Sequence, residues 1–275
     1  MLRAVFVDMD DTFVAPDKTI PAGNLRVLDL AHERGVQVVP CTGRSVAGLP
    51  PELVAHPSVR YAVCGGGAIV YDVREDRLVS EEVIGARTVR ALYEDLRDLR
   101  VTFDLFADDR IFTGADRWAV LGEMGVSAEL RRMLVSLRTR FEPDTDALID
   151  SMGERACRIN VFCADGRDRE TVHDIARAHP ELTCVSSLPC NAELTRAGVD
   201  KGSGLRRVCE LMGVDAADVV AFGDSGNDVP MLRAAGDGVA MAGAAPEVRA
   251  AADHVALRCE DAGVARYLEP LLATS

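Results

Sequence analysis

Acidic side chains follow two apolar segments that lie far apart in the chain. Asp8 and Asp10 come directly after the first apolar run. Asp224 and Asp228 follow another such run near the C-terminal end. Four acids at one edge of a sheet would repel one another and raise each other's pKa unless a cation lay among them. Oxygen ligands favour a hard divalent metal, so this pattern predicts a Mg²⁺ site.

Three further groups could hold a phosphate beside that cation. They are the hydroxyl of Thr42, the backbone amides of the turn at Gly43 and the ammonium of Lys201. Together they supply hydrogen-bond donors and positive charge for a dianion. The combination of acids and donors indicates chemistry on a phosphate ester.

The elements that must position these residues alternate between strand and helix. Short apolar runs at 4–7, 36–39, 61–64 and 219–222 predict buried strands, each followed by polar or glycine residues, and 201–211 has a helical pattern. This alternation is typical of an α/β fold with a doubly wound parallel sheet, in which ligands bind at the carboxyl ends of the strands.

The middle of the chain lacks the regular alternation of buried strand and helix, and its predicted helices lie beside several strands. It indicates a hairpin over 71–79 and then an inserted α+β domain over 84–188, which leaves 1–83 and 189–275 as the core domain. Within the insert the pattern predicts helices over 88–99, 129–140 and 167–178, and strands over 101–106, 110–113, 157–163 and 183–187.

Composition excludes several classes of protein. The chain of 275 residues has 48% hydrophobic residues and a formal net charge of −13, without the basic face that nucleic-acid binding requires. Charged residues interrupt every apolar run before it could span a bilayer. We therefore expect a soluble, cytoplasmic protein with neither a nucleic-acid nor a membrane partner. The eight cysteines lack the spacing of metal or redox motifs, so we expect free thiols.

Four segments, taken in order, resemble the motifs of the haloacid dehalogenase (HAD) superfamily. The long insert between the second and third motifs looks like that of the Cof-type (HAD-IIB) branch, which carries a C2 cap. Four motifs in order at the ends of predicted strands are a specific signal, whereas a lone Asp-x-Asp is a weak one. The segments are Asp-Met-Asp-Asp-Thr at 8–12, Thr-Gly-Arg at 42–44, Lys-Gly at 201–202 and Gly-Asp-Ser-Gly-Asn-Asp at 223–228.

The resemblance implies a Rossmann-like core and a two-step reaction. Asp8 would attack phosphorus and form an aspartyl-phosphate, while Asp10 would protonate the leaving oxygen and later activate water. Mg²⁺ would be held by the carboxylates of Asp8 and Asp224 and by the backbone carbonyl of Asp10.

The remaining site residues are also implied by the resemblance. Thr42, Gly43, Lys201 and Asn227 would hold the phosphoryl oxygens. Asp228 would support the site and orient Lys201, and Arg44 would have a supporting role.

The sequence departs from the family pattern at three places. Asp11 replaces a common glycine. Gly66 and Gly243 stand where relatives often have asparagine, which removes two side chains near the site without changing the reaction class. We expect the single tryptophan, Trp118, to pack within the insert.

The expected function is hydrolysis of a small phosphorylated metabolite, such as a sugar phosphate, by a Mg²⁺-dependent phosphomonoesterase. A phosphomutase or phosphotransferase would use the same aspartyl-phosphate and stays open. A non-catalytic phosphate-responsive regulator is the alternative from another class, although receiver domains are about half this length and lack a large insert. The sequence leaves open whether the protein is a monomer or a homodimer.

Overall fold

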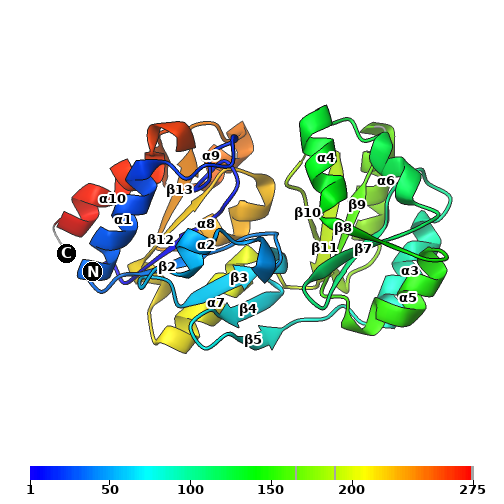
Figure 1. Cartoon of the computed structure of the whole chain (residues 1–275), viewed down its shortest axis with the longest axis horizontal. Coiled ribbons are helices and arrows are strands. Elements are labelled where there is room, and N and C mark those ends of the chain that lie inside the picture. Colours follow the sequence, from blue (N-terminus) through cyan, green and yellow to red (C-terminus); the bar gives the residue numbers. More distant parts are fainter. Residues whose placement is uncertain (165, 189, 274–275) are drawn as a thin grey trace. The chain divides into compact units, whose positions relative to one another are not determined.

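The computed structural model describes residues 1–164, 166–188 and 190–273, and the chain divides into two compact units (Figure 1). The first unit comprises Met1–Ser80 and Asp200–Ser275, and the second comprises Glu81–Val199. The second unit ends later than the expected boundary at residue 188. The reason is that β11 (Asn191–Arg196) pairs with β9 (Arg158–Phe162) and β10 (Leu182–Val185) of the second unit.

The first unit is built on a five-stranded parallel sheet, as the alternating pattern predicts. Its strand order is β14-β13-β12-β1-β2. The central strands are buried along their whole length, which explains their continuous apolar sequence. The strands are β1 (Ala4–Val7), β2 (Gln37–Pro40), β12 (Val219–Gly223), β13 (Asp237–Met241) and β14 (His254–Ala256).

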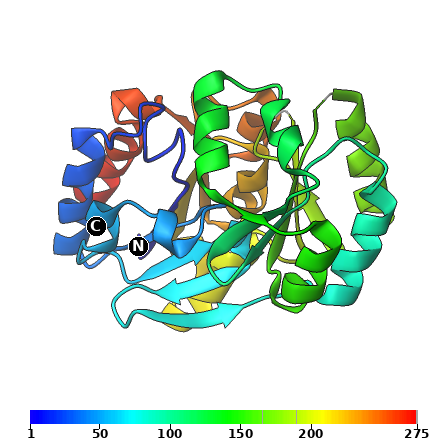
Figure 2. The ribbon, with the colours of Figure 1, turned by 45° about the vertical axis from the view of Figure 1, so that its right-hand side comes forward.

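Helices cover both faces of this sheet. On one face, α1 (Ala22–Glu33) and α10 (Gly263–Ala273) lie side by side, as the dark blue and red ribbons of Figures 1 and 2 show. On the other face, alternate residues of β1 and β12 pack against three helices. These helices are α7 (Lys201–Met212), α8 (Val229–Ala234) and α9 (Pro246–Ala251). The doubly wound α/β fold is confirmed.

The predicted strand at 61–64 forms, but it lies in a separate small sheet and not in the main parallel sheet. β3 (Tyr61–Cys64) follows the short helix α2 (Pro51–Val54) and forms a three-stranded sheet with β4 (Ile69–Asp72) and β5 (Arg77–Glu81). β3 and β4 pair antiparallel. A single parallel bridge between Cys41 and Val63 continues the main sheet into this small one.

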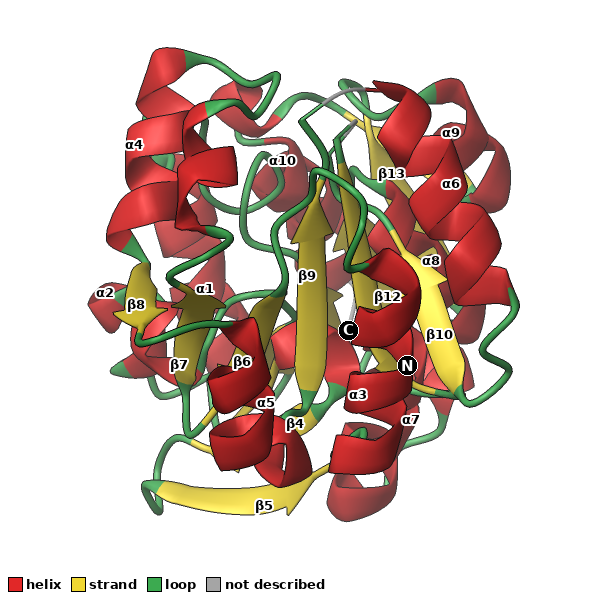
Figure 3. Cartoon of the chain, turned by 90° about the vertical axis from the view of Figure 1, so that its right-hand side faces the viewer, coloured by secondary structure: helices red, strands yellow, loops and turns green. Residues whose placement is uncertain are grey.

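The second unit contains a six-stranded sheet with the order β10-β11-β9-β6-β7-β8. Its other strands are β6 (Asp104–Ala107), β7 (Arg110–Gly114) and β8 (Arg138–Phe141). The helices α3 (Ala86–Leu96), α5 (Thr145–Met152) and α6 (Gly166–Arg177) share one apolar core with this sheet (Figure 3).

Two local predictions for the second unit need correction. The helix expected over 129–140 is α4 (Ala128–Ser136) and stops at Ser136, because Arg138–Phe141 forms β8 and pairs in parallel with β7. The helix α5 and the strands β8 and β11 had no counterpart in the prediction. Trp118 packs against Leu121, Met124 and Phe162 within this unit, as expected.

The sheet face away from the helices α3, α5 and α6 carries buried charge. Arg138 Nη2 lies 2.7 Å from Asp104 Oδ2, and both side chains are almost completely buried. Arg158 Nη2 lies 2.7 Å from Glu193 Oε2, again with both side chains buried. The first pair joins β8 to β6, on either side of β7, and the second joins the neighbouring strands β9 and β11.

Two sequence-based expectations concern the whole chain. All eight cysteines are free thiols, as their spacing predicts. Among the helices in the described residues, none combines the length and the apolar character that crossing a membrane requires.

Candidate active site

The order of the main sheet gathers three of the predicted motifs. Asp8 directly follows β1, Thr42 lies two residues after the end of β2, and Asp224 directly follows β12. Because β12, β1 and β2 are neighbours and parallel, their carboxyl ends lie at the same edge of the sheet. The residues that sequence reasoning singled out from opposite ends of the chain therefore meet.

Lys201 supplies a buried ammonium at the centre of this edge. Its Nζ donates to Asp8 Oδ1 and to Asp228 Oδ1, both at 2.6 Å. The side chain is 1% exposed. Lys201 is the first residue of α7, and Asp200 caps that helix by accepting from the amide of Ser203. A fully buried lysine needs such anionic partners, since an unpaired buried ammonium is strongly disfavoured.

Asp228 is fixed by a second set of donors. Its Oδ2 accepts from the backbone amides of Asp224 and Ser225, each at 3.0 Å. Gly223 is needed for this approach, because a Cβ there would lie 2.4 Å from Asp228 Cβ. One oxygen of Asp228 therefore accepts from Lys201 while the other accepts from two backbone amides. Because these amides hold the carboxylate in place, Asp228 orients the lysine.

Three carboxylates of the site lie close enough to share a cation. Asp8, Asp224 and Asp228 each offer an oxygen within 4.8 Å of the others. Lys201 balances only one of these charges, so an additional cation would relieve the repulsion among them. The all-oxygen donor set fits a divalent metal ion. Asp228 accepts hydrogen bonds at both of its oxygens, whereas the hydrogen bonds described for Asp8 and Asp224 involve Oδ1, so these two residues are better placed to ligate the ion.

The ionisation of the cluster reflects this crowding. Burial, followed by repulsion from Asp228, raises the pKa of Asp8 well above its ordinary value. The same two causes raise the pKa of Asp224 to about 7. Burial alone would lower the pKa of Lys201, but Asp228 and Asp8 raise it well above its usual range. These shifts favour the charged form of the lysine, and a further cation would stabilise the ionised forms of the two acids.

Asp10 has different partners from Asp8. Arg44 donates to both of its oxygens, from Nε to Oδ2 at 2.9 Å and from Nη2 to Oδ1 at 2.5 Å. Lys18 Nζ donates to Oδ1 at 2.9 Å. Burial acts to raise the pKa of Asp10, but the hydrogen bonds and charges of Arg44 and Lys18 outweigh it and lower the pKa.

The remaining predicted residues lie in the loops around the cluster. Thr42 is buried, and its Oγ1 accepts from the amide of Arg44 at 3.1 Å. Gly43 lies between these two residues in the same loop. Asn227 is buried in the turn after β12, where its Oδ1 accepts from Ser225 Oγ at 3.1 Å.

Sequence reasoning missed two contacts of the site. Thr12 Oγ1 donates to Asp224 Oδ1 at 3.4 Å. Thr12 stands four residues after Asp8 in the first motif, so its place in the motif was a usable signal. Lys18 reaches Asp10 from a loop in which its own φ is +68°, and nothing in the local sequence predicts that contact.

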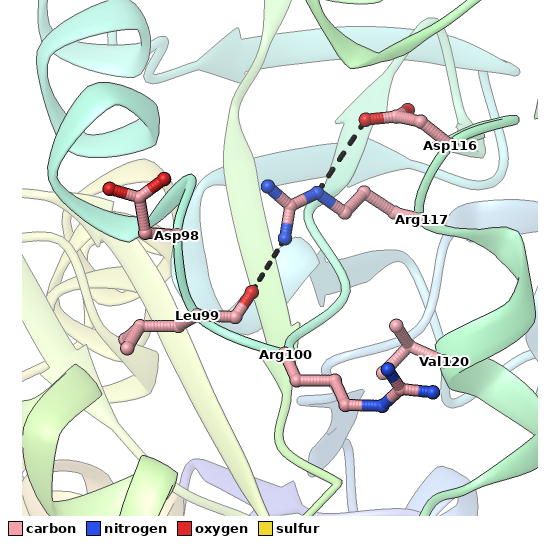
Figure 4. Close-up of a pocket in the computed structure, with 6 residues that line it drawn as sticks. All are labelled: Asp98, Leu99, Arg100, Asp116, Arg117 and Val120. Carbon is pink, nitrogen blue, oxygen red and sulfur yellow. Dashed lines mark hydrogen bonds and ion pairs between the residues drawn. The ribbon is translucent and has the colours of Figure 1, made fainter.

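Two hollows of the surface differ in what surrounds them. One, of about 150 Å³, borders Asp224 and is lined by Asp11, Gly243 and Arg258, so it adjoins the carboxylate cluster. The other, of about 400 Å³, lies in the second unit (Figure 4). Its arginines are already engaged: Arg117 donates to the carbonyl of Leu99 at 2.7 Å, and Arg100 pairs with Glu123.

Similarity to known proteins identifies the family of the chain. Residues 5–268 match the haloacid dehalogenase-like hydrolase family, and the chain belongs to that family. It is 26% identical over 276 residues to the putative phosphatase YxeH of Bacillus subtilis, covering 99% of each chain. It is 28% identical to an HMP-PP phosphatase of Escherichia fergusonii, covering 98% of this chain and 95% of that one.

The fold has a close counterpart among solved structures. The sugar phosphatase BT4131, of HAD subclass IIB, superposes with a TM-score of 0.82 at 21% identity, covering 98% of each chain. The expected superfamily, the fold class and the expectation of a hydrolase are confirmed. The relatives named above carry the names of a putative phosphatase and of an HMP-PP phosphatase, and phosphatase is the enzyme class that the motifs predict.

Proposed function

We propose that the protein is a phosphomonoesterase that acts on a small phosphorylated metabolite and requires a divalent cation, most suitably Mg²⁺. One observation carries the proposal: the buried ammonium of Lys201 donates to Asp8 at 2.6 Å, within a cluster of three carboxylates. A nucleophilic anion, a neutralising amine and a set of oxygen ligands are the parts that attack on a phosphate dianion needs.

In the first step of the proposed reaction, an oxygen of Asp8 attacks phosphorus. The bond from phosphorus to the ester oxygen breaks, the electron pair stays on that oxygen, and Asp10 supplies its proton. In the second step Asp10 takes a proton from water, which attacks the aspartyl-phosphate, releases inorganic phosphate and regenerates Asp8.

The other residues of the site support this reaction. Thr42, Gly43, Lys201 and Asn227 are proposed to hold the phosphoryl oxygens, and Asp228 keeps Lys201 in place. Asp8, Asp224 and the backbone carbonyl of Asp10 would hold the metal ion, which lowers the repulsion between nucleophile and substrate when bound. The second unit, residues 81–199, is proposed to be the C2-type cap, which we expect to select the substrate.

The named activities of relatives leave the substrate open. One relative is an HMP-PP phosphatase and one structural neighbour is a sugar phosphatase. We therefore propose a small phosphate ester as the substrate class, and no single compound.

Phosphate release from a panel of phosphorylated metabolites, with Mg²⁺ or with EDTA, tests the proposal. The panel should contain sugar phosphates, phosphorylated cofactor precursors and p-nitrophenyl phosphate. Release that needs Mg²⁺, needs no added acceptor and is lost in Asp8→Asn would support it. Transfer only to an added alcohol would indicate a phosphotransferase, and the absence of both reactions would contradict the proposal.

A further inference from the structure

We propose that Arg44 is a positioning residue, which holds the carboxylate of Asp10 in the orientation needed to protonate the leaving group. This inference rests on the function proposed above and gives Arg44 a definite task. The alternative is that Arg44 contacts the phosphate of the substrate directly.

The geometry of the pair favours positioning. Arg44 Nε and Nη2 donate to the two separate oxygens of Asp10, at 2.9 and 2.5 Å. Two parallel hydrogen bonds of this kind fix the plane of a carboxylate as well as its place. Asp10 is 44% exposed at its side chain, so without such contacts it would sample several rotamers.

Arg44 is itself held at both ends. Its Nη1 donates to the carbonyl of Gly48 at 2.9 Å. Its backbone amide donates to Thr42 Oγ1, and its carbonyl accepts from Gly65. Nε, Nη1 and Nη2 are each engaged with protein groups, so the guanidinium already has a task that does not involve the substrate.

Lys18 contributes a third, weaker restraint. Its Nζ donates to Asp10 Oδ1 at 2.9 Å, but its side chain is 48% exposed. Asp8 has a separate partner in Lys201. The two acids, two residues apart in sequence, are therefore held by different cations.

The test compares two classes of ester through kcat/KM, which reports all steps up to departure of the leaving group. An alkyl phosphate needs a proton on its leaving oxygen, whereas p-nitrophenyl phosphate releases a stabilised anion. Arg44→Gln also removes a charge that lowers the pKa of Asp10, a change that by itself would favour the protonated acid. The loss of orientation should outweigh this effect and lower kcat/KM roughly 10- to 100-fold on the fastest alkyl phosphate of the panel, part of the full contribution of a general acid. On p-nitrophenyl phosphate the loss should stay below about threefold.

Further variants separate positioning from substrate binding. Asp10→Asn should show the same preference for the aryl ester, and adding Arg44→Gln to it should cause no further loss, since both changes remove one function. Arg44→Lys keeps the charge without the paired hydrogen bonds and should be intermediate. The control is Arg60→Gln, which removes an arginine that pairs with Asp72 in the same unit, and it should leave both substrates unaffected.

Three results would overturn the inference. Equal losses on the two esters would make Arg44 a substrate ligand. Losses that multiply in the double variant would show that Arg44 and Asp10 act independently. A faster Arg44→Gln enzyme would show that the contact between Arg44 and Asp10 slows the reaction. Failure of the proposed function itself is a distinct outcome, because either the parent protein would then release phosphate from neither ester, or Asp8→Asn would retain full activity on both.

Discussion

Asp228 accepts from Lys201 at 2.6 Å with one oxygen and from two backbone amides with the other. The amine therefore donates to a carboxylate whose two oxygens both accept hydrogen bonds, and it also donates to Asp8 at 2.6 Å. Such preorganisation lets a charge act on the reacting group without rearranging during the reaction.

Replacing the buried lysine should remove most of the activity. Lys201→Met leaves Asp8 and Asp228 without the ammonium that donates to both of them, so we expect kcat/KM to fall by at least about 100-fold. Steady-state phosphate release measures the loss. Arg207→Gln, an exposed substitution on the same helix, is the matched control and should stay within about twofold of the parent protein. Activity of Lys201→Met close to that of Arg207→Gln would contradict this account of the lysine.

Metal binding should depend on pH through Asp224. The pKa of Asp224 is raised to about 7 in the metal-free protein, against about 3.9 in an unfolded chain. The raised pKa means that protonated Asp224 favours the folded state. This contribution to the free energy of unfolding is fully present below about pH 4 and is lost as the pH rises through about 7. A metal ion must displace the remaining proton, so binding should strengthen over the same range.

Thermal unfolding with Mg²⁺ and with EDTA measures this effect. The increase in Tm caused by Mg²⁺ should be larger at pH 8 than at pH 6, and Asp224→Asn should abolish most of the increase at both. A stabilisation by Mg²⁺ that is equal at the two pH values, or larger at the lower one, would show that Asp224 does not control the site.

The buried pair Arg138–Asp104 should matter more for stability than an exposed pair of the same unit. Arg138→Ala leaves Asp104, which is fully buried, without its partner, so we expect a loss of about 3–5 kcal/mol in the free energy of unfolding. Arg155→Ala breaks an exposed pair with Asp108 and should cost at most about 1 kcal/mol. Urea denaturation of both variants checks the contrast, which equal losses would refute.

The glycine run after β3 should tolerate an asparagine at one position and reject it at the next. Gly66 has φ 72° and ψ 21°, a left-handed conformation that asparagine adopts readily, so Gly66→Asn should change the free energy of unfolding by less than about 1 kcal/mol. Gly67 has φ 111°, and a Cβ there would lie 2.0 Å from the carbonyl oxygen of Asp200.

Gly67→Asn should therefore destabilise the first unit by roughly 3 kcal/mol or more. Chemical denaturation of the two variants in parallel makes the comparison. If Gly66→Asn proved the more damaging of the two, the loop conformation described here would be incorrect.

The parts of the site that sequence predicts are those set by local pattern and chain order. Asp8 and Asp224 directly follow buried strands, and parallel strands bring such positions to one edge of the sheet. Lys201 is recognisable from its glycine neighbour and its order among the motifs. For these residues the backbone alone fixes the approximate position, and the strand pattern predicts the backbone.

Other features depend on rotamers or on long-range pairing, which local pattern does not encode. The contact of Arg44 with Asp10 joins two loops 34 residues apart. β8 is a four-residue strand, Arg-Thr-Arg-Phe, directly after a helix, and only its pairing with β7 makes it a strand. The C-terminal boundary of the second unit, at Val199, was missed for the same reason. β11 belongs to this unit because it pairs with β9 and β10.

The central claim is that Asp8 accepts the phosphoryl group. Rapid acid quench during turnover of p-nitrophenyl phosphate, followed by proteolysis and mass spectrometry, tests it directly. The account predicts one added phosphoryl group on the peptide that contains Asp8, and none in Asp8→Asn, which should release no phosphate. A phosphorylated peptide from elsewhere in the chain, or phosphate release by Asp8→Asn at the parent rate, would contradict it.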